Sequence, residues 1–181
     1  MKFIIASDIH GDFESAKSLF SVFEKEHANK LIILGDILYH GPRNDLPNSY
    51  NPKKVINLLN NYKDYIISVR GNCDAEVDQM VLDFPIMREN RYIEVDGLRI
   101  FATHGHHFDE TNPPLMSNGE ILLHGHTHIP KCVKFNNDNY CLNPGSISIP
   151  KNGFKPSYML YENRRFTILS FDGDVIFDLK I

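Results

Sequence analysis

The sequence predicts an α/β fold in which two β-sheets pack together and helices lie outside them. In residues 1–70, apolar runs with the length of buried strands alternate with segments of helical periodicity, and this order favours parallel strands joined by crossover helices. Later in the chain, short strand-like segments separated by turn residues indicate hairpins and an antiparallel meander. No repeat, low-complexity tract or linker interrupts the sequence, so residues 1–181 are expected to form one domain.

Hydrophobic periodicity defines the elements expected in residues 1–70. Continuous apolar runs are typical of strands buried on both faces, and apolar residues three or four positions apart are typical of amphipathic helices. The segment 39–52 is rich in Pro, Asn and Gly and is expected to be a loop. The expected strands are Phe3–Ala6, Leu31–Leu34 and Tyr65–Val69, and the expected helices are Glu14–Glu26 and Lys53–Tyr62.

Beyond residue 90 the pattern predicts short strands. Asp96-Gly97 is a strong signal for a two-residue hairpin turn, and further turns are expected at 136–139, at Asn163 and at Asp172-Gly173. The apolar meander after Ser157 is either core or the surface of a homo-oligomer contact. The expected strands are Arg91–Val95, Leu98–Ala102, Ile121–Leu123, Lys131–Phe135, Tyr140–Leu142, Ser157–Glu162, Arg165–Phe171 and Val175–Leu179.

Composition argues against several classes of partner. The net charge of −4 disfavours a long nucleic-acid substrate, which needs a basic face. No stretch approaches the roughly 20 apolar residues of a membrane span, and the first apolar run is too short for a signal peptide. The 3 cysteines lack the spacing of a disulfide scaffold and predict reduced thiols. We therefore expect a cytoplasmic protein with no membrane partner.

Five polar clusters each follow directly on a short apolar run. Ligands of open α/β sheets bind beyond the carboxyl ends of the strands, so the fold can bring such clusters to one edge. Each cluster alone is also typical of an ordinary turn, a helix cap or a hydrogen-bonded histidine. Together, their oxygen and nitrogen donors suit two divalent ions such as Mn, Fe, Ni or Zn better than Ca. The clusters are Asp8-Ile9-His10, Gly35-Asp36, Gly71-Asn72-Cys73-Asp74, Thr103-His104-Gly105 and Gly125-His126-Thr127-His128.

Residue type indicates what each cluster would contribute. Asp36 has two carboxylate oxygens and can bridge two metals, whereas Asn72 offers a neutral carbonyl oxygen that limits negative charge. His126 and His128 are two positions apart, which would place both rings on one side of an extended segment. These donors predict a binuclear metal site in a hydrolase.

In these five clusters the chain resembles the calcineurin-like metallophosphoesterase superfamily, whose pattern is D-x-H, G-D, G-N-H-(D/E), H and G-H-x-H. The match runs from Asp8 to His128, and the short chain is similar to the YfcE-like (MJ0936-type) phosphodiesterases. The resemblance implies two mixed β-sheets packed as a sandwich and flanked by helices. It implies two divalent metal ions, usually Mn²⁺, one held by Asp8, His10, Asp36 and His128 and the other by Asp36, Asn72, His104 and His126.

One position departs from the superfamily pattern. Cys73 stands where the pattern has a histidine that is commonly assigned to leaving-group protonation or transition-state stabilisation. Three interpretations are open: another group takes this role, the substrate has a good leaving group, or Cys73 is a turn residue with no role in the chemistry. A nucleophilic thiol is the least favoured interpretation. Asp74 is expected to accept a hydrogen bond that orients a histidine.

The sequence thus predicts a phosphodiesterase that acts on a small phosphodiester. A water or hydroxide between the two metals is expected to attack phosphorus in line, while the metals neutralise charge on the phosphoryl oxygens. His106, His40 and Arg43 are candidates for binding substrate oxygens, although Arg43 is equally typical of a solvated loop cation. His27 and His124 are expected to be structural.

Three rival functions share these features. A phosphomonoesterase would use the same chemistry, and Cys73 favours diesters over monoesters. A non-catalytic scaffold, as in one eukaryotic retromer subunit of similar fold, would show eroded ligands, whereas all seven expected ligands are present here. A nuclease is disfavoured by the acidic balance and by the lack of a basic aromatic stripe.

Overall fold

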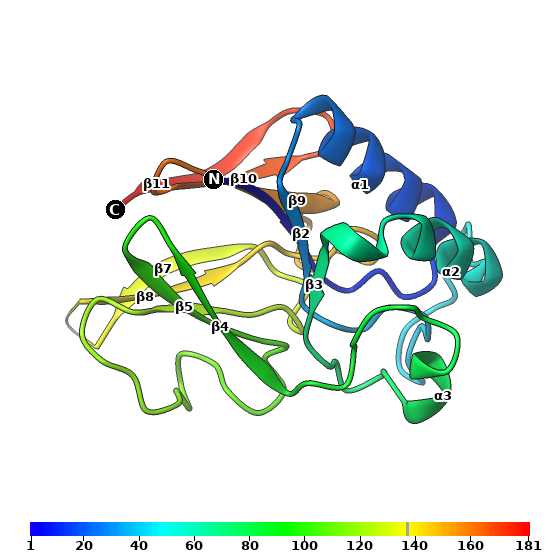
Figure 1. The fold of residues 1–181 in the computed structure, drawn as a ribbon, viewed down its shortest axis with the longest axis horizontal. Helices are drawn as coiled ribbons and strands as arrows, with labels where there is room; N and C mark the ends of the chain where they lie inside the picture. The colour runs from blue at the N-terminus through cyan, green and yellow to red at the C-terminus, as the bar shows by residue number, and fades with distance from the viewer. Residues whose placement is uncertain (137) are drawn as a thin grey trace.

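The computed structural model, which describes residues 1–136 and 138–181, shows two stacked β-sheets with helices on the outer face of the first (Figure 1). The expected arrangement of two mixed β-sheets flanked by helices is confirmed. The strands are β1 Lys2–Ala6, β2 Lys30–Ile33, β3 Ile66–Ser68, β4 Asn90–Val95, β5 Leu98–Thr103, β6 Ile121–Leu123, β7 Lys131–Phe135, β8 Asn139–Asn143, β9 Ser157–Glu162, β10 Arg165–Ser170 and β11 Val175–Lys180, and the helices are α1 Phe13–Lys25, α2 Pro52–Asn61, the 3₁₀ turn η1 Lys63–Tyr65 and α3 Glu76–Gln79.

The first sheet has the order β11-β10-β9-β1-β2-β3. Its strands β1, β2 and β3 are parallel, which confirms the crossover connections expected from the alternation of strands and helices. The closing meander pairs antiparallel with β1 through β9 and so extends this sheet. The carboxyl ends of β1, β2 and β3 therefore lie at one edge of the sheet, and that edge carries the first three polar clusters.

The second sheet has the order β4-β5-β6-β8-β7, with β5, β6 and β8 parallel and the outer strands antiparallel. The hairpin between β4 and β5 turns at Asp96-Gly97, where both residues have positive φ (49° and 76°), as a two-residue hairpin of the primed type requires. Asn137, which belongs to the turn expected at 136–139, lies outside the described residues.

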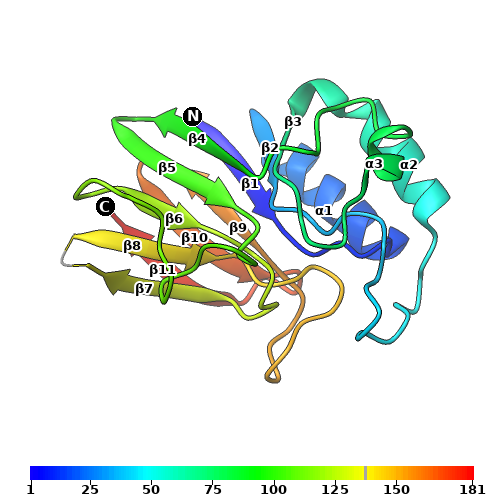
Figure 2. The ribbon, with the colours of Figure 1, turned by 90° about the horizontal axis from the view of Figure 1, so that it is seen from below.

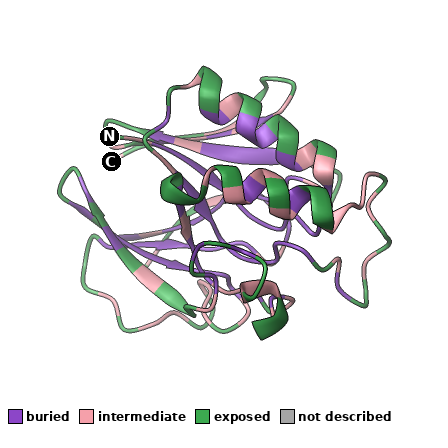
Figure 3. Ribbon diagram, turned by 45° about the vertical axis from the view of Figure 1, so that its right-hand side comes forward, coloured by how far each residue is buried: buried purple, intermediate pink, exposed green. Residues whose placement is uncertain are grey.

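Three apolar layers hold the elements together, and Figure 3 shows the buried strands between the half-exposed helices and the outer loops. The first layer joins α1 and α2 to the outer face of the first sheet, and the helices group at one side of the molecule (Figure 2). The second layer lies between the sheets and includes Ile5, Leu34 and Leu123. The third is a small cluster on the outer face of the second sheet around Leu122 and Cys141.

The meander after Ser157 contributes to the core between the sheets. Met159 and Tyr161 of β9, and Phe166 and Ile168 of β10, belong to the buried layer between the sheets. The edge strand β11 is only half-buried. Of the two roles left open by the sequence, the core therefore accounts for the apolar residues of β9 and β10.

The cap of α1 positions two loops that lead to the site. The Asp12 carboxylate accepts a hydrogen bond from the Ser15 backbone N–H at 2.8 Å and so caps α1, which begins at Phe13, three residues after His10. The other oxygen of Asp12 accepts a hydrogen bond from the Ser49 backbone N–H at 3.2 Å and ties the loop 39–51 to the same point.

The short elements η1 and α3 were not expected from the sequence. Within the described residues, no helix combines the length and apolar character needed to cross a membrane.

Truncation of the core between the sheets tests this packing. Leu123 is fully buried (0% exposed) in a central strand of the second sheet, so we expect Leu123→Ala to lower the free energy of unfolding by about 2–5 kcal/mol. The matched control is Leu115→Ala, because Leu115 is 99% exposed and its change should stay within about 0.5 kcal/mol. Urea denaturation monitored by circular dichroism measures both values. Equal losses in the two variants would contradict the layer assignment.

Candidate metal centre

The seven candidate ligands from the five clusters meet at the carboxyl edge of both sheets. Asp8 and His10 follow β1, Asp36 follows β2, and Asn72 follows β3. His104 follows β5, and the pair at 126 and 128 follows β6. The first group of donors lies around the His128 Nε2 atom, which is 3.3 Å from both His10 Nε2 and Asp8 Oδ1.

The second group of donors lies around His104. Its Nε2 atom is 3.1 Å from Asn72 Oδ1, 3.3 Å from His126 Nδ1 and 3.4 Å from Asp36 Oδ2. The same Asp36 Oδ2 is 3.7 Å from His10 Nε2 in the first group. Asp36 therefore stands between the two groups, as expected for a residue shared by both.

Backbone carbonyls orient three of the four histidines. In each of these rings Nδ1 donates a hydrogen bond to a carbonyl oxygen, so Nε2 is left as the lone-pair nitrogen and faces the other donors. Such contacts fix both the tautomer and the ring plane of a metal-binding histidine. The pairs are His10 with Tyr39 (2.7 Å), His104 with Leu34 (2.6 Å) and His128 with Ile149 (2.6 Å).

The two buried aspartates have a common arrangement. Asp8 Oδ2 accepts the His126 backbone N–H at 3.0 Å, and Asp36 Oδ1 accepts the Cys73 N–H at 2.8 Å. Each remaining oxygen faces the histidines, and Asp8 Oδ1 is buried without a hydrogen-bond partner among the described residues. Such an oxygen needs a cation, because an unpaired buried charge is costly.

Electrostatics in the site indicate the same need. Burial alone would raise the pKa of Asp8, but its close contact with His128 and the nearby imidazoles lower it, so the carboxylate stays charged. Burial disfavours a charged His104, yet its contact with Asp36 and the charge of Asp8 raise the pKa of its ring to about 9, so without a metal a proton occupies Nε2 beside Asp36, and a divalent cation would take the place of that proton. Buried oxygen anions and inward nitrogen lone pairs fit divalent cations with borderline preferences, and no thiolate is required.

The backbone at this edge is left-handed at five of the seven candidate ligands. This conformation costs a side-chain-bearing residue about 1–3 kcal/mol, and such residues gather at functional sites. At His126 and His128 it also overturns a sequence expectation, since these residues do not lie on one side of an extended segment. Their rings turn to different donor groups, His126 to His104 and His128 to Asp8. The five φ values are 57° at Asp8, 48° at His10, 54° at Asp36, 65° at His126 and 61° at His128.

Close approach of the loops requires glycine at two positions. A Cβ atom on Gly71 would lie 2.1 Å from Asp36 Oδ1, and one on Gly125 would lie 1.8 Å from Ser7 Oγ. Any larger residue would push the loop after β3 away from Asp36, or the loop after β6 away from β1. The glycines of the G-N and G-H motifs thus allow the loops to reach the centre.

Asp74 differs from its expected role. Its carboxylate is buried and accepts three backbone N–H groups, from Asp36 (2.9 Å), Ile37 (2.8 Å) and Gly71 (2.7 Å). The expected contact with a histidine is therefore wrong, because all these donors are backbone groups of the loops after β2 and β3. Burial raises the pKa of Asp74 to about 6 in spite of these bonds. Asp74 positions Asp36 rather than a histidine.

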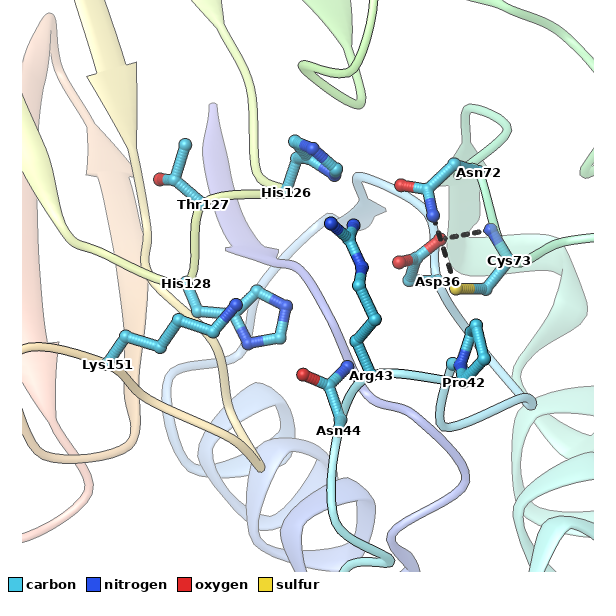
Figure 4. Close-up of a pocket in the computed structure, with 11 residues that line it drawn as sticks. Asp36, Pro42, Arg43, Asn44, Asn72, Cys73, His126, Thr127, His128 and Lys151 are labelled. Carbon is cyan, nitrogen blue, oxygen red and sulfur yellow. Dashed lines mark hydrogen bonds between the residues drawn. The ribbon is translucent and has the colours of Figure 1, made fainter.

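A pocket of about 390 Å³ opens onto this centre (Figure 4). The Arg43 side chain reaches toward the space between His126 and Asp36, and Lys151 lies beside His128. Lys151, with the polar residue Asn44, was missed by the sequence analysis. The sequence held a signal for Lys151, because it lies five residues after the polar segment 143–146, which directly follows an expected strand as the five polar clusters do.

That segment supports the first donor group. The hydroxyl groups of Ser146 and Ser148 each donate to the Asp8 carbonyl oxygen at 2.8 Å. The Asn143 side-chain amide donates to the Gly125 carbonyl oxygen at 2.7 Å. The loop after β8 thereby holds the turn after β1 and the turn after β6 in place.

Cys73 lines the pocket as a protonated thiol. Burial, followed by the charge of Asp36, raises its pKa to about 12. The Asn72 side-chain amide is 3.3 Å from Cys73 Sγ, and the Cys73 backbone N–H supports Asp36. Burial and the charge of Asp36 thus disfavour a thiolate at this position.

The two further histidine candidates lie outside the pocket. His106 is next to the second donor group, with its ring centroid 5.4 Å from that of His104, and burial lowers its pKa to about 4. His40 packs edge-on against Tyr39 and Tyr50. Neither ring is among the described residues that line the 390 Å³ pocket.

Two proteins named phosphodiesterases and one solved structure are similar to this chain. A protein named phosphodiesterase YfcE from Escherichia coli strain K12 is 42% identical over 176 residues, which cover 97% of this chain and 95% of that protein. A protein named phosphodiesterase MJ0936 from Methanocaldococcus jannaschii is 26% identical over 152 residues, covering 80% and 83% of the two chains. The solved structure of YfcE, a phosphoesterase from E. coli, superposes with a TM-score of 0.97 at 41% identity and covers 100% of both chains.

The family model of the calcineurin-like phosphoesterase superfamily domain matches residues 1–165. This range contains all five polar clusters and both donor groups. The protein therefore belongs to the calcineurin-like phosphoesterase superfamily.

Proposed function

We propose that the protein is a phosphoric diester hydrolase that uses two divalent metal ions to cleave a small phosphodiester. Its superfamily and its 42% identity to a protein named phosphodiesterase support the reaction class. The observation that carries the binuclear centre is the position of Asp36 Oδ2, 3.4 Å from His104 Nε2 and 3.7 Å from His10 Nε2. One carboxylate oxygen thus belongs to two donor groups.

The donor groups define which residues would hold the metals. The set contains carboxylate, amide and imidazole donors, which suits Mn²⁺, with Fe, Ni or Zn as alternatives. Bound divalent cations would acidify a water molecule and neutralise charge on the phosphoryl oxygens. One ion would be held by Asp8, His10, Asp36 and His128, and the other by Asp36, Asn72, His104 and His126.

Two cationic side chains in the pocket would bind the substrate. Arg43 reaches toward the space between the donor groups, and its guanidinium can contact two phosphoryl oxygens at once. Lys151 supplies a second positive charge at the other wall. His106 lies outside this pocket, next to the second donor group, so any contact of its neutral ring with the substrate would be a hydrogen bond beyond the pocket wall.

A diester suits this pocket better than a monoester. Cys73 cannot protonate a leaving group as an imidazolium would, so the substrate needs an alcohol that leaves readily. The scaffold alternative is disfavoured, since all seven donors are retained and face one another.

The free thiols of Cys73, Cys132 and Cys141 support a cytoplasmic location.

Replacement of the shared ligand tests the metal centre. We expect Asp36→Asn to lower kcat/KM for a phosphodiester by at least about 100-fold, because loss of a mere outer partner already costs up to that amount. Metal content, measured by inductively coupled plasma mass spectrometry, should fall together with activity. Asp64→Asn, at an exposed position, is the control and should keep both. Full activity of Asp36→Asn with two bound metals would refute the centre.

Replacement of the pocket arginine tests substrate binding. We expect Arg43→Ala to raise KM for the diester about 10-fold or more, which corresponds to loss of one charge-assisted hydrogen bond, with a smaller effect on kcat. Arg43→Lys should recover part of the loss, since it keeps the charge without the two-pronged contact. Lys134→Ala, on exposed β7, serves as the matched control for removal of a surface cation. Steady-state kinetics measure KM. An unchanged KM for Arg43→Ala would show that Arg43 is a solvated loop cation that does not bind the substrate.

Matched substrates distinguish the ester classes. With p-nitrophenyl phosphate and bis(p-nitrophenyl) phosphate, which share one leaving group, we expect the higher kcat/KM for the diester in protein reconstituted with Mn²⁺. A higher value for the monoester would make the protein a phosphomonoesterase with the same centre. Absence of hydrolysis of both substrates by protein with full metal content would favour the scaffold.

A further inference from the structure

A second set of metal-ligand residues lies on the outer face of the second sheet. Cys141 belongs to β8 and His124 directly follows β6, so the two residues come from neighbouring strands. Glu110 comes from the segment between β5 and β6, which also contributes Phe108 to the apolar cluster on this face. The side chain of His124 and the whole of Cys141 are fully buried, whereas the Glu110 side chain is 24% exposed. The three ligand atoms lie within 4.8 Å of one another.

The carboxylate of Glu110 faces both other residues with a single oxygen. Its Oε2 atom is 3.6 Å from His124 Nε2 and 3.6 Å from Cys141 Sγ. Its other oxygen, Oε1, forms an ion pair with Lys131. The carboxylate is thereby oriented from outside, in the way that a ligating carboxylate is usually supported by a further hydrogen bond.

The imidazole of His124 turns a lone pair into this cluster. Its Nδ1 atom is 3.0 Å from the Gly125 carbonyl oxygen and donates to it. The Asn143 side-chain amide, which is close to Nδ1, already donates to Gly125 O at 2.7 Å and to Thr127 Oγ1 at 3.1 Å. The lone pair is therefore on Nε2. In residues 1–136 and 138–181 this buried atom has no hydrogen-bond partner, although it points at a carboxylate.

A lone pair that faces a carboxylate oxygen across 3.6 Å is repulsive unless a cation lies between them. Tetrahedral Zn²⁺ with bonds of about 2.0–2.3 Å separates its nitrogen and oxygen ligands by about 3.4 Å, and its sulfur and oxygen ligands by about 3.6 Å. The observed separations of 3.6 Å are close to both values. Thiolate, imidazole and carboxylate together select zinc over Mg or Ca.

We propose that Glu110, His124 and Cys141 form a zinc site on the outer face of the second sheet, which shares no ligand with the binuclear centre. On binding, a bond forms between Cys141 Sγ and Zn²⁺, and the thiol proton leaves to solvent. Solvent reaches the fourth position past the partly exposed Glu110. The ion fastens the segment between β5 and β6 to the sheet. This segment begins with His104, and His124 lies two residues before His126, so the ion also steadies two ligands of the other centre.

Cobalt substitution tests the site through its thiolate. Protein depleted of metal by a chelator and reloaded with Co²⁺ is expected to show the intense near-ultraviolet absorption of a thiolate-to-cobalt transition, which oxygen and nitrogen ligands do not produce. Cys141→Ser should abolish this absorption and lower the zinc content of zinc-equilibrated protein by one ion per chain. Glu110→Gln changes a partly exposed loop residue and should weaken zinc binding at least about 10-fold. This variant tests the site even if Cys141→Ser does not fold.

Matched variants separate this site from the rest of the molecule. Cys132→Ser removes a half-buried thiol outside the cluster, and Cys73→Ser removes the thiol beside the binuclear centre. Both should keep the absorption, and Glu94→Gln, at an exposed strand position, should keep zinc affinity. The site would be overturned if the wild-type protein lacks the absorption or if folded Cys141→Ser retains it. It would also be overturned if Cys73→Ser is the one variant that loses the absorption. None of these readouts depends on phosphodiesterase activity, so failure here leaves the proposed reaction untouched.

Discussion

Buried carboxylates that accept backbone N–H groups from neighbouring loops determine the geometry of the whole centre. Asp8 holds the loop after β6, Asp36 holds the loop after β3, and Asp74 joins the loops after β2 and β3. These bonds offset the cost of the left-handed backbone at the ligand positions. They also aim one oxygen of each ligating aspartate at the histidines, so the orientation of the donors is built into the loops.

The two sheets have separate but complementary roles. The first sheet supplies the carboxylates, the amide and one imidazole, because Asp8 and His10 follow β1, Asp36 follows β2 and Asn72 follows β3. The second sheet supplies His104, His126 and His128. The apolar layer between the sheets sets their spacing and hence the distance between oxygen and nitrogen donors. Catalytic geometry in this superfamily fold therefore depends on ordinary hydrophobic packing some distance from the pocket.

The sequence predicted the elements and ligand positions that rest on local patterns, and failed where distant contacts decide. Hydrophobic periodicity was sufficient for β1–β3, α1 and α2, whereas α3 spans four residues and is too short to show a period. The pairing of β9 with β1 is set by packing, which no local pattern reports. The left-handed turns at His126 and His128 arise from bonds to loops far away in the chain. The same holds for Asp74, whose N–H donors include residues in another loop.

Long sequence separations within the centre have a consequence for biosynthesis. His10 and His128, whose Nε2 atoms are 3.3 Å apart, are separated by 118 residues, and the ring of His128 is itself oriented by the carbonyl of Ile149. A nascent chain that has exposed only β1, β2 and β3 carries both aspartates without three of the four imidazoles. All seven donors are present once translation has passed residue 128, but the last of them is oriented only after residue 149. Binding of a metal ion by the full, oriented donor set would therefore follow folding of the two sheets.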